Sequence, residues 1–191
     1  QGGVLGGDVK VLGLNENTCQ GDFVYRDYFG TSYSYDNTGK ITSVQSDSGQ
    51  HIAYTYNGNN IATATASYFG ETTQAVSYSY DASGNLLSSV GNDGVKVSYT
   101  YPSTGNKGMP VSVTISDSSG QNSSTTTYEY YENYNYLKSV TEATGAKTEY
   151  IYDNGSTINK GLVTAVIDPN GNRTNYTYDS DNRVSKKTNG N

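Results

Sequence analysis

His51 and Cys19 are the side chains of this sequence best suited to nucleophilic or general-base chemistry, and each is the single residue of its type. A cysteine–histidine pair also needs a third group that orients the imidazole and a pocket that holds the substrate. A lone cysteine cannot form an internal disulfide. We interpret His51 as a strand residue that occupies the place of Lys96 or Thr148 in later parts of the chain, and we predict that this chain is not an enzyme.

Recurring aspartates are the candidates for acid–base chemistry. Asp36, Asp81, Asp153 and Asp179 each follow a Tyr-x-Tyr pair directly. Turn geometry accounts for this shared position, because an aspartate at the first position of a turn accepts hydrogen bonds from its own backbone. Neighbouring copies would also lie a whole repeat apart, which is too far for a catalytic carboxylate pair. We predict no catalytic residue among them.

Residues 179–182, with the sequence DSDN, begin like a calcium-binding loop. They lack the glycine and the closing glutamate at the spacing that such a loop requires. A cation shared by neighbouring turn aspartates is the weaker alternative, because hard cations take six or more oxygen ligands. We therefore predict no metal site and no cofactor.

The elements that would position these side chains form a repeat. Seven Tyr-x-Tyr pairs follow one another about 24 residues apart, a period typical of repeat proteins. They begin at Tyr33, Tyr54, Tyr78, Tyr99, Tyr128, Tyr150 and Tyr176. The residue after the pair is mostly Asp or Asn, and three residues later Gly or Asn is common. The residues that define the repeat most clearly are Tyr33, Tyr35, Asp36, Gly39, Tyr78, Tyr80, Asp81, Gly84, Tyr176, Tyr178 and Asp179.

Each position of this pattern has a structural role. Tyrosines two residues apart lie on one face of a strand. The Asp accepts a hydrogen bond in a turn, and Gly or Asn takes the left-handed backbone position that follows. Asp-x-x-Gly between β-rich runs predicts a hairpin with a type I turn and a bulge. In the returning run ITSV the apolar residues are three apart, so either both faces are partly covered or a bulge intervenes.

A second, glycine-containing turn precedes each aromatic pair, as in SDSGQHIAYTY and DPNGNRTNYTY. Each repeat is then strand, Asp-turn, strand and Gly-turn, with strands of about eight residues. No apolar stretch keeps a helical period beyond two turns. We predict an all-β fold of antiparallel hairpins. The polar run at 117–127 is expected to be a loop and the preferred site of proteolysis.

Composition limits the kind of core that the chain can build. Hydrophobic residues make up only 33% of the chain, and 20 residues are tyrosine. The core must therefore consist largely of tyrosine rings, which bury an apolar body and keep a polar hydroxyl. The net charge of −6 argues against a nucleic-acid partner, which would require a basic patch. No run of 18 apolar residues is present, so we predict no membrane insertion.

The composite pattern D-x-x-G-x4-Y-x-Y-D-x-x-G-x-L is similar to the YD repeat of the RHS family. DPNGNRTNYTYDSDNRV at 168–184 is the cleanest copy, and YSYDNTGKITSV at 33–44 is nearly as good. The resemblance covers residues 30 to about 187. The family includes bacterial RHS and wall-associated toxin proteins, the C component of insecticidal toxin complexes, and animal teneurins. The segment 168–171, Asp-Pro-Asn-Gly, resembles the self-cleaving stretch of some members, but we interpret it as a turn.

The resemblance implies a long β-sheet that spirals into a hollow shell, which in bacterial members encloses a C-terminal toxin. Seven repeats are too few to close a shell, so we expect a curved, open segment at 30–191, preceded by a non-repeat segment or cap at 1–29. Because the chain starts at Gln1 and stops within a repeat, we interpret it as a fragment of a longer chain. Its expected partners are neighbouring repeats and a C-terminal toxin or effector of the same chain, at a secreted or cell-surface location and of bacterial origin.

The tyrosines permit a second hypothesis, a carbohydrate- or cell-wall-binding module. Exposed rings in a row stack on sugar faces, whereas rings that pack across strands only stabilise the sheet. The structural interpretation accounts for most of the rings, because the chain has few other apolar residues. A ligand-binding surface is expected first where the pattern breaks down, in YEYYENYNY. The residues of this cluster are Tyr128, Tyr130, Tyr131, Tyr134 and Tyr136.

Overall fold

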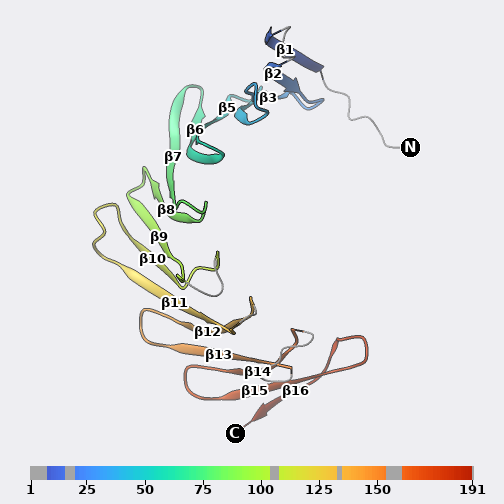
Figure 1. Cartoon of the computed structure of the whole chain (residues 1–191), viewed down its shortest axis with the longest axis vertical. Helices are drawn as coiled ribbons and strands as arrows, with labels where there is room; N and C mark the ends of the chain where they lie inside the picture. The colour runs from blue at the N-terminus through green and yellow to red at the C-terminus, as the bar shows by residue number, and fades with distance from the viewer. Residues whose placement is uncertain (1–7, 16–19, 104–107, 133–134, 154–160, 191) are drawn as a thin grey trace. The chain divides into compact units, whose positions relative to one another are not determined.

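The computed structural model describes residues 8–15, 20–103, 108–132, 135–153 and 161–190 (Figure 1). Every regular element in these ranges is a β-strand, and sixteen strands follow one another in chain order within the sheet. The prediction of an all-β, repetitive antiparallel sheet is confirmed. The chain divides into two compact units, residues 1–95 and 96–191. Each unit is described by itself.

The first unit contains eight strands. They are β1 (Asp8–Asn15), β2 (Gln20–Arg26), β3 (Thr31–Tyr35), β4 (Ile41–Ser46), β5 (Gln50–Asn57), β6 (Asn60–Tyr68), β7 (Glu71–Tyr80) and β8 (Leu86–Gly91). Each of the strands β1 to β7 pairs antiparallel with the strand that follows it. The segment before the first repeat thus contains two strands, β1 and β2, and β2 pairs directly with the first tyrosine strand, β3.

The second unit repeats the arrangement. Its strands are β9 (Val95–Thr100), which starts at the last residue of the first unit, β10 (Ser112–Asp117), β11 (Ser124–Tyr130), β12 (Leu137–Thr141), β13 (Lys147–Tyr152), β14 (Val163–Ile167), β15 (Arg173–Tyr178) and β16 (Val184–Gly190). The strands from β10 onward pair antiparallel with their successors. Most strands in the chain are shorter than the eight residues expected.

The Asp-turn has the same hydrogen bonds in different repeats. The N–H of Asp36 donates to the carbonyl of Lys40, and the N–H of Gly39 donates to the carbonyl of Asp36. The Asp36 carboxylate accepts the N–H groups of Thr38 and Lys40 at 2.8 and 3.0 Å. Gly39 has a φ of 83°, a left-handed value that residues with a Cβ rarely adopt. The sequence pattern and the turn geometry therefore agree.

A bulge opposite the tyrosine pair decides between the two interpretations of ITSV. Tyr33 pairs with Val44 and Tyr35 pairs with Ile41, and the register shifts between the two pairs. Directly paired residues of antiparallel strands share a face. The extra residue, Thr42, therefore lets two apolar residues three positions apart lie on the same face as both tyrosines. The same register occurs in the second unit, where Tyr150 and Tyr152 pair with Val166 and Val163.

The opposite face of the sheet carries small polar side chains. The middle residue of the Tyr-x-Tyr pair is often Ser or Thr, and its partner across the strands is also Ser or Thr. Their hydroxyls lie within hydrogen-bond distance in Thr55–Thr63, Ser79–Ser88 and Thr100–Ser112. Thr177 pairs with Lys186 instead, and its hydroxyl lies 3.1 Å from that of the neighbouring bulge residue Ser185. Cross-strand pairs of this kind each stabilise a sheet by about 0.2–1 kcal/mol. One face is thus aromatic and aliphatic, and the other is hydroxyl-rich.

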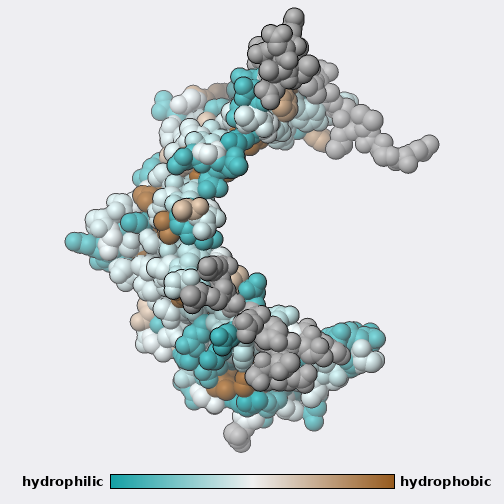
Figure 2. Space-filling view, viewed as in Figure 1, coloured by the Kyte–Doolittle hydropathy of each residue, from teal (hydrophilic) through white to brown (hydrophobic). Residues whose placement is uncertain are grey.

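Few side chains are fully buried. Among the described residues, Tyr152 and Ala165 are the buried hydrophobic side chains, with 8% and 0% of their surface exposed. Figure 2 shows a visible surface dominated by hydrophilic and neutral residues, with small separate hydrophobic patches. Stability therefore depends on the hydrogen-bonded ladders and cross-strand pairs rather than on a deep apolar core.

Two local expectations are wrong. The run at 117–127 is not a loop as a whole, because β11 starts at Ser124 and Thr125–Thr127 pair with β10. Its threonines have high β propensity, which outweighs their polarity. In the second repeat Asn60 does not take the left-handed position: Asn57 and Asn60 pair directly, and Gly58 between them has a φ of 58°. A shorter hairpin replaces the Asp-turn there.

None of the residues in the described ranges forms a helix with the length and hydropathy that crossing a membrane requires. This agrees with the short, polar strands seen throughout both units.

Candidate functional site

The turn aspartates direct their carboxylates to their own turns. The side chain and the N–H of Asn85 donate to Asp81 and lower the pKa of its carboxyl group. The hydroxyl of Thr38 and the N–H of Lys40 lower the pKa of Asp36 in the same way. Lowered pKa values keep these groups ionised as hydrogen-bond acceptors, which is the opposite of what a general acid at neutral pH requires.

The calcium-like segment at 179–182 is closed by an arginine. Arg183 forms ion pairs with Asp179 at 2.9 Å and with Asp181 at 2.8 Å. The backbone N–H groups of Asp181 and Arg183 also donate to the Asp179 carboxylate. A guanidinium group thus supplies the positive charge at this turn. No cluster of three or more potential metal ligands occurs in the part of the chain that the structure describes.

The segment Asp168–Gly171 forms a Gly-turn. The carboxylate of Asp168 accepts the N–H groups of Asn170 and Asn172, both at 2.9 Å. The side-chain amide of Asn172 donates to its other oxygen at 2.8 Å. Gly171 has a φ of 82°. All contacts of this carboxylate belong to the turn.

The tyrosine cluster expected to bind a ligand is partly engaged within the protein. The hydroxyl of Tyr130 donates to the carbonyl of Pro110 at 2.9 Å, and that of Tyr131 donates to the carbonyl of Tyr150 at 3.0 Å. The rings of Tyr131 and Tyr136 both pack against Tyr152, at centroid distances of 5.7 and 5.1 Å. Tyr128 lies in β11, and Tyr134 lies outside the described residues. Ligand binding by this cluster stays a prediction.

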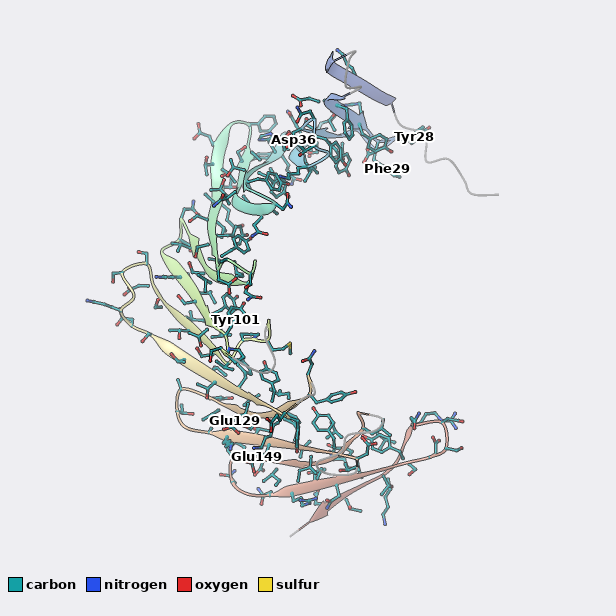
Figure 3. All side chains as sticks on the ribbon, in the orientation of Figure 1. Tyr28, Phe29, Asp36, Tyr101, Glu129 and Glu149 are labelled. Atoms are coloured by element: carbon teal, nitrogen blue, oxygen red, sulfur yellow. The ribbon has the colours of Figure 1, made fainter. Side chains whose placement is uncertain are left out.

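A charged network lies on the hydroxyl-rich face of the second unit. Ser139 pairs with Glu129 on one side and with Glu149 on the other, so the three side chains share one face. The Ser139 hydroxyl, on a residue only 1% exposed, donates to the Glu129 carboxylate at 2.9 Å. This hydrogen bond lowers the pKa of Glu129. Figure 3 shows Glu129 and Glu149 on neighbouring hairpins of this unit.

Lys147 completes this network. Its ammonium group lies 3.1 Å from the Glu149 carboxylate and 3.6 Å from the Glu129 carboxylate. The contact with Glu149 raises the pKa of Lys147. Two carboxylates, a hydroxyl and a cation therefore satisfy one another. The sequence did not indicate this cluster, because its members come together only through the register of three strands.

A groove of about 750 Å³ lies in the first unit, at the end of the sheet that carries the Gly-turns. Its floor is a ladder of directly paired residues on five adjacent strands, β2 to β6. The ladder consists of Arg26, Ser32, Gln45, His51 and Ser67. All five line the groove. The predicted strand position of His51 thus places the single histidine in this groove, whereas Cys19 lies outside the described residues.

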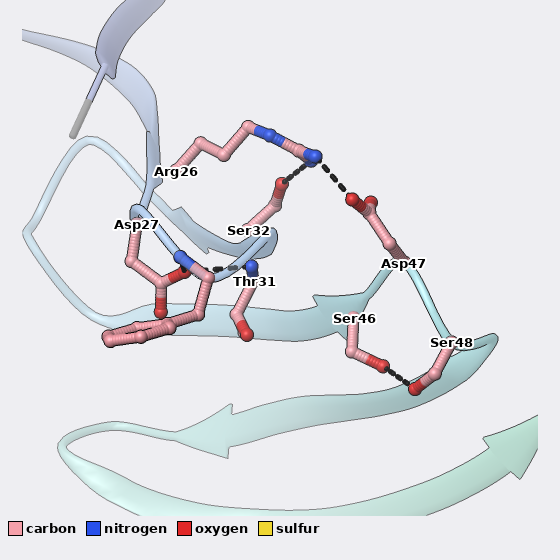
Figure 4. Close-up of polar contacts among 8 residues, drawn as sticks. Arg26, Asp27, Thr31, Ser32, Ser46, Asp47 and Ser48 are labelled. Atoms are coloured by element: carbon pink, nitrogen blue, oxygen red, sulfur yellow. Dashed lines mark hydrogen bonds and ion pairs between the residues drawn. The ribbon is translucent and has the colours of Figure 1, made fainter.

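The β4–β5 and β6–β7 turns line the groove, and hydrogen bonds connect them to each other and to the β2–β3 turn. Arg26 reaches the β4–β5 turn through a 2.5 Å ion pair with Asp47, and it also donates to Ser32 at 3.3 Å (Figure 4). The N–H of Asp47 donates to the carbonyl of Gly30 in the β2–β3 turn. The N–H of Phe69, in the β6–β7 turn, donates to the carbonyl of Gly49 at 3.0 Å. The groove is therefore a built feature of adjacent hairpins.

Two aromatic dipeptides stand at the tips of these turns. Tyr28 and Phe29 are 86% and 88% exposed, and Figure 3 places them at the β2–β3 turn. Tyr68 and Phe69 are 50% and 74% exposed at the β6–β7 turn. The sequence signal is the tripeptide YFG, which occurs at 28–30 and again at 68–70. Tyrosine spacing alone did not reveal it, because it lies outside the Tyr-x-Tyr pairs.

The repeat has a counterpart among known protein families. Residues 160–191, which include the β15–β16 hairpin with its Tyr-x-Tyr-Asp sequence, match the family model described as RHS Repeat. The predicted resemblance to the RHS repeat is confirmed for this segment. No protein of curated function matches the chain in sequence.

Solved structures share the fold. The chain is similar to part of the crystal structure of TcdB2-TccC3-Cdc42, with a TM-score of 0.68 and 16% identity, over 94% of this chain and 10% of that chain. The crystal structure of TcdB2-TccC3-TEV matches 87% of this chain and 13% of that chain, with 14% identity and a TM-score of 0.49. The chain therefore spans about a tenth of the length of these structures. At such low identity, the first match shows the fold alone.

Proposed function

We propose that this chain is a non-catalytic wall segment of a longer, secreted or cell-surface RHS protein, in which its sheet forms part of a β-shell. The shell would enclose or present a C-terminal toxin or effector of the same chain. The observation that carries this proposal is the pairing of the strands in chain order. The side chains that define the repeat make their contacts within the sheet and its turns. The similarity to about a tenth of a much longer chain supports it.

The repeat residues favour a wall over a catalytic surface. The Asp carboxylates bind their own turns, the tyrosine pairs face the apolar residues of the bulged strand, and the hydroxyl of Tyr178 binds a carbonyl of the preceding hairpin. Within the described residues, β1 pairs only with β2 and β16 only with β15. Each of these outer strands offers an edge to which further repeats can be added.

The test uses the complete reading frame that contains this segment. The whole protein is expressed and exposed to a protease, and the sequence that follows the repeats is quantified by mass spectrometry. The same downstream sequence, expressed without the repeats, is the matched control. Enclosure predicts that this sequence is cleaved at least about tenfold more slowly in the whole protein, because only opened molecules are cleaved.

The proposal would be overturned by equal cleavage rates in the two proteins. A reading frame without any sequence beyond the repeats would also overturn it, because the shell would then have nothing of its own chain to enclose. An electron cryomicroscopy map of the whole protein, with density inside a closed wall, would support it independently.

A further inference from the structure

The groove of the first unit has a lining that the repeat does not require. Elsewhere on the hydroxyl-rich face, Ser and Thr pairs such as Thr55–Thr63 bind each other. In the groove the same face carries Arg26, Gln45 and His51, three larger side chains with planar polar groups. Adjacent strands are about 4.8 Å apart, so a ladder on five strands is about 19 Å long. This row of hydrogen-bonding groups is long enough for a ligand of several units.

The charge of the lining selects among ligand classes. Arg26 is ion-paired with Asp47 at 2.5 Å, so the guanidinium charge is compensated inside the groove. The opposite charges of Arg26 and Asp47 in the lining thus cancel. Phosphate and other anions are recognised by arginine forks that are not already compensated. The lining therefore favours an uncharged ligand that both donates and accepts hydrogen bonds, as amide and hydroxyl side chains do.

Phe69 supplies an apolar face at the rim of the groove. Its φ of 47° is unusual for a bulky residue, and the hydrogen bond from its N–H to Gly49 holds it there. The ring lies over Gly49: a Cβ on that glycine would be 2.8 Å from the ring. Even so, 74% of Phe69 is exposed. The protein thus holds a strained residue without burying its ring, an arrangement that recurs at ligand sites.

We propose that this groove binds a neutral oligosaccharide. The C–H face of a pyranose ring would stack on Phe69, and its hydroxyls would hydrogen-bond to Gln45, His51 and the polar edges of the Arg26–Asp47 pair. Concave sites that combine an aromatic surface with a few convergent polar groups are typical of small-ligand binding. The proposal is independent of the enclosed C-terminal sequence, because it concerns only this chain's own residues.

The test uses the full 191-residue chain. It is applied to an array of neutral, uronic-acid-containing and sialylated oligosaccharides, and positive ligands are titrated by isothermal calorimetry. Phe69→Ala should weaken binding at least about tenfold, equivalent to about 1.4 kcal/mol. Gly49→Ala should also weaken it, because the new methyl group would lie 2.8 Å from the Phe69 ring and because the φ of 90° strains any residue with a Cβ. Tyr28→Ala, an exposed aromatic change outside the lining, is the matched control and should leave the affinity within about twofold.

A second variant, Gln45→Ala, keeps the test decisive if Phe69→Ala disturbs the turn, because Gln45 is an exposed strand residue. It should weaken binding while circular dichroism and the unfolding midpoint stay unchanged. Absence of binding to any neutral glycan would overturn the proposal, as would exclusive binding of acidic glycans. Equal losses in Phe69→Ala and Tyr28→Ala would also overturn it, since they would indicate general aromatic adhesion. These outcomes do not depend on whether the parent chain encloses a toxin or effector.

Discussion

The hydroxyl of Tyr178 donates a 2.6 Å hydrogen bond to the backbone carbonyl of Val163, in the preceding hairpin. Tyr56 does the same to the carbonyl of Ile41 at 2.7 Å. Ile41 and Val163 hold equivalent places, next to the bulge opposite the second tyrosine of the preceding repeat. A bulge interrupts the ladder, so a carbonyl there needs another donor. The second tyrosine of the pair thus joins one repeat to the one before it.

Removing this hydroxyl should weaken the contact between repeats. Tyr56→Phe and Tyr178→Phe are each expected to lower the free energy of unfolding by about 1 kcal/mol, because a carbonyl loses its donor while the ring stays. Urea unfolding followed by circular dichroism measures the change. Tyr54→Phe is the matched control, since its hydroxyl has no hydrogen-bond partner among the described residues. Equal losses in Tyr54→Phe and Tyr56→Phe would contradict the assigned role.

Gly39 tests the left-handed position of the Asp-turn. Apart from its two chain neighbours, no residue has an atom within 4 Å of a Cβ placed on it, so space does not explain the glycine. Its left-handed φ of 83° explains the glycine instead. Asn182 holds the equivalent position of the last repeat with a φ of 61°. Gly39→Ala should cost about 1–2 kcal/mol of stability, whereas Gly39→Asn should cost clearly less, since Asn tolerates this region. Equal unfolding midpoints for the two variants would show that backbone conformation is not what selects the glycine.

The sequence predicted the features that are local. An aspartate followed three residues later by glycine forms its hydrogen bonds within five residues, so the turns and the all-β fold follow from spacing alone. The bulge was left open because apolar residues three apart in ITSV fit two arrangements. Pairing of Tyr35 with Ile41 decides the matter, and pairing depends on register across strands.

The candidate groove and the Glu129–Ser139–Glu149 network lie beyond such local patterns. Each collects residues from three or more strands, and a shift of one residue in any register would turn a member to the other face. His51 illustrates the difference. Its place within its strand could be predicted, but its neighbours Gln45 and Ser67 become known only from the paired strands.

The hydrogen bond from Ser139 to Glu129 should be visible in a titration. It is the main cause of the lowered pKa of Glu129, with the charge of Lys147 as a further cause. Ser139→Ala should therefore move the pKa of Glu129 up toward its ordinary value of 4.5. Carboxyl chemical shifts followed by NMR over pH 2 to 7 report this change. Lys147→Met is the comparison and should raise the same pKa by less, because the Ser139 donor remains. A larger rise in Lys147→Met than in Ser139→Ala would reverse the assignment.

The turn aspartates should make stability fall in acid. The pKa values of six of them lie below the ordinary 3.8, because turn N–H groups and side chains donate to the ionised form: Asp27, Asp36, Asp81, Asp117, Asp168 and Asp179. A pKa lowered in the folded state stabilises the fold at pH values above the unfolded pKa. This stabilisation is lost as the pH falls from about 4 through the folded pKa values, because protons then bind more tightly to the unfolded chain.

Urea midpoints measured from pH 7 to pH 2 should therefore stay nearly level down to about pH 4 and then decline. Asp81→Asn is the matched variant, since an amide oxygen still accepts the turn N–H groups but does not titrate. It should be less stable than the parent at pH 7, where the ionised carboxylate is the stronger acceptor, and the difference should shrink toward pH 2. A difference that is independent of pH would mean that the charge of Asp81 contributes nothing and that only the shape of the turn matters.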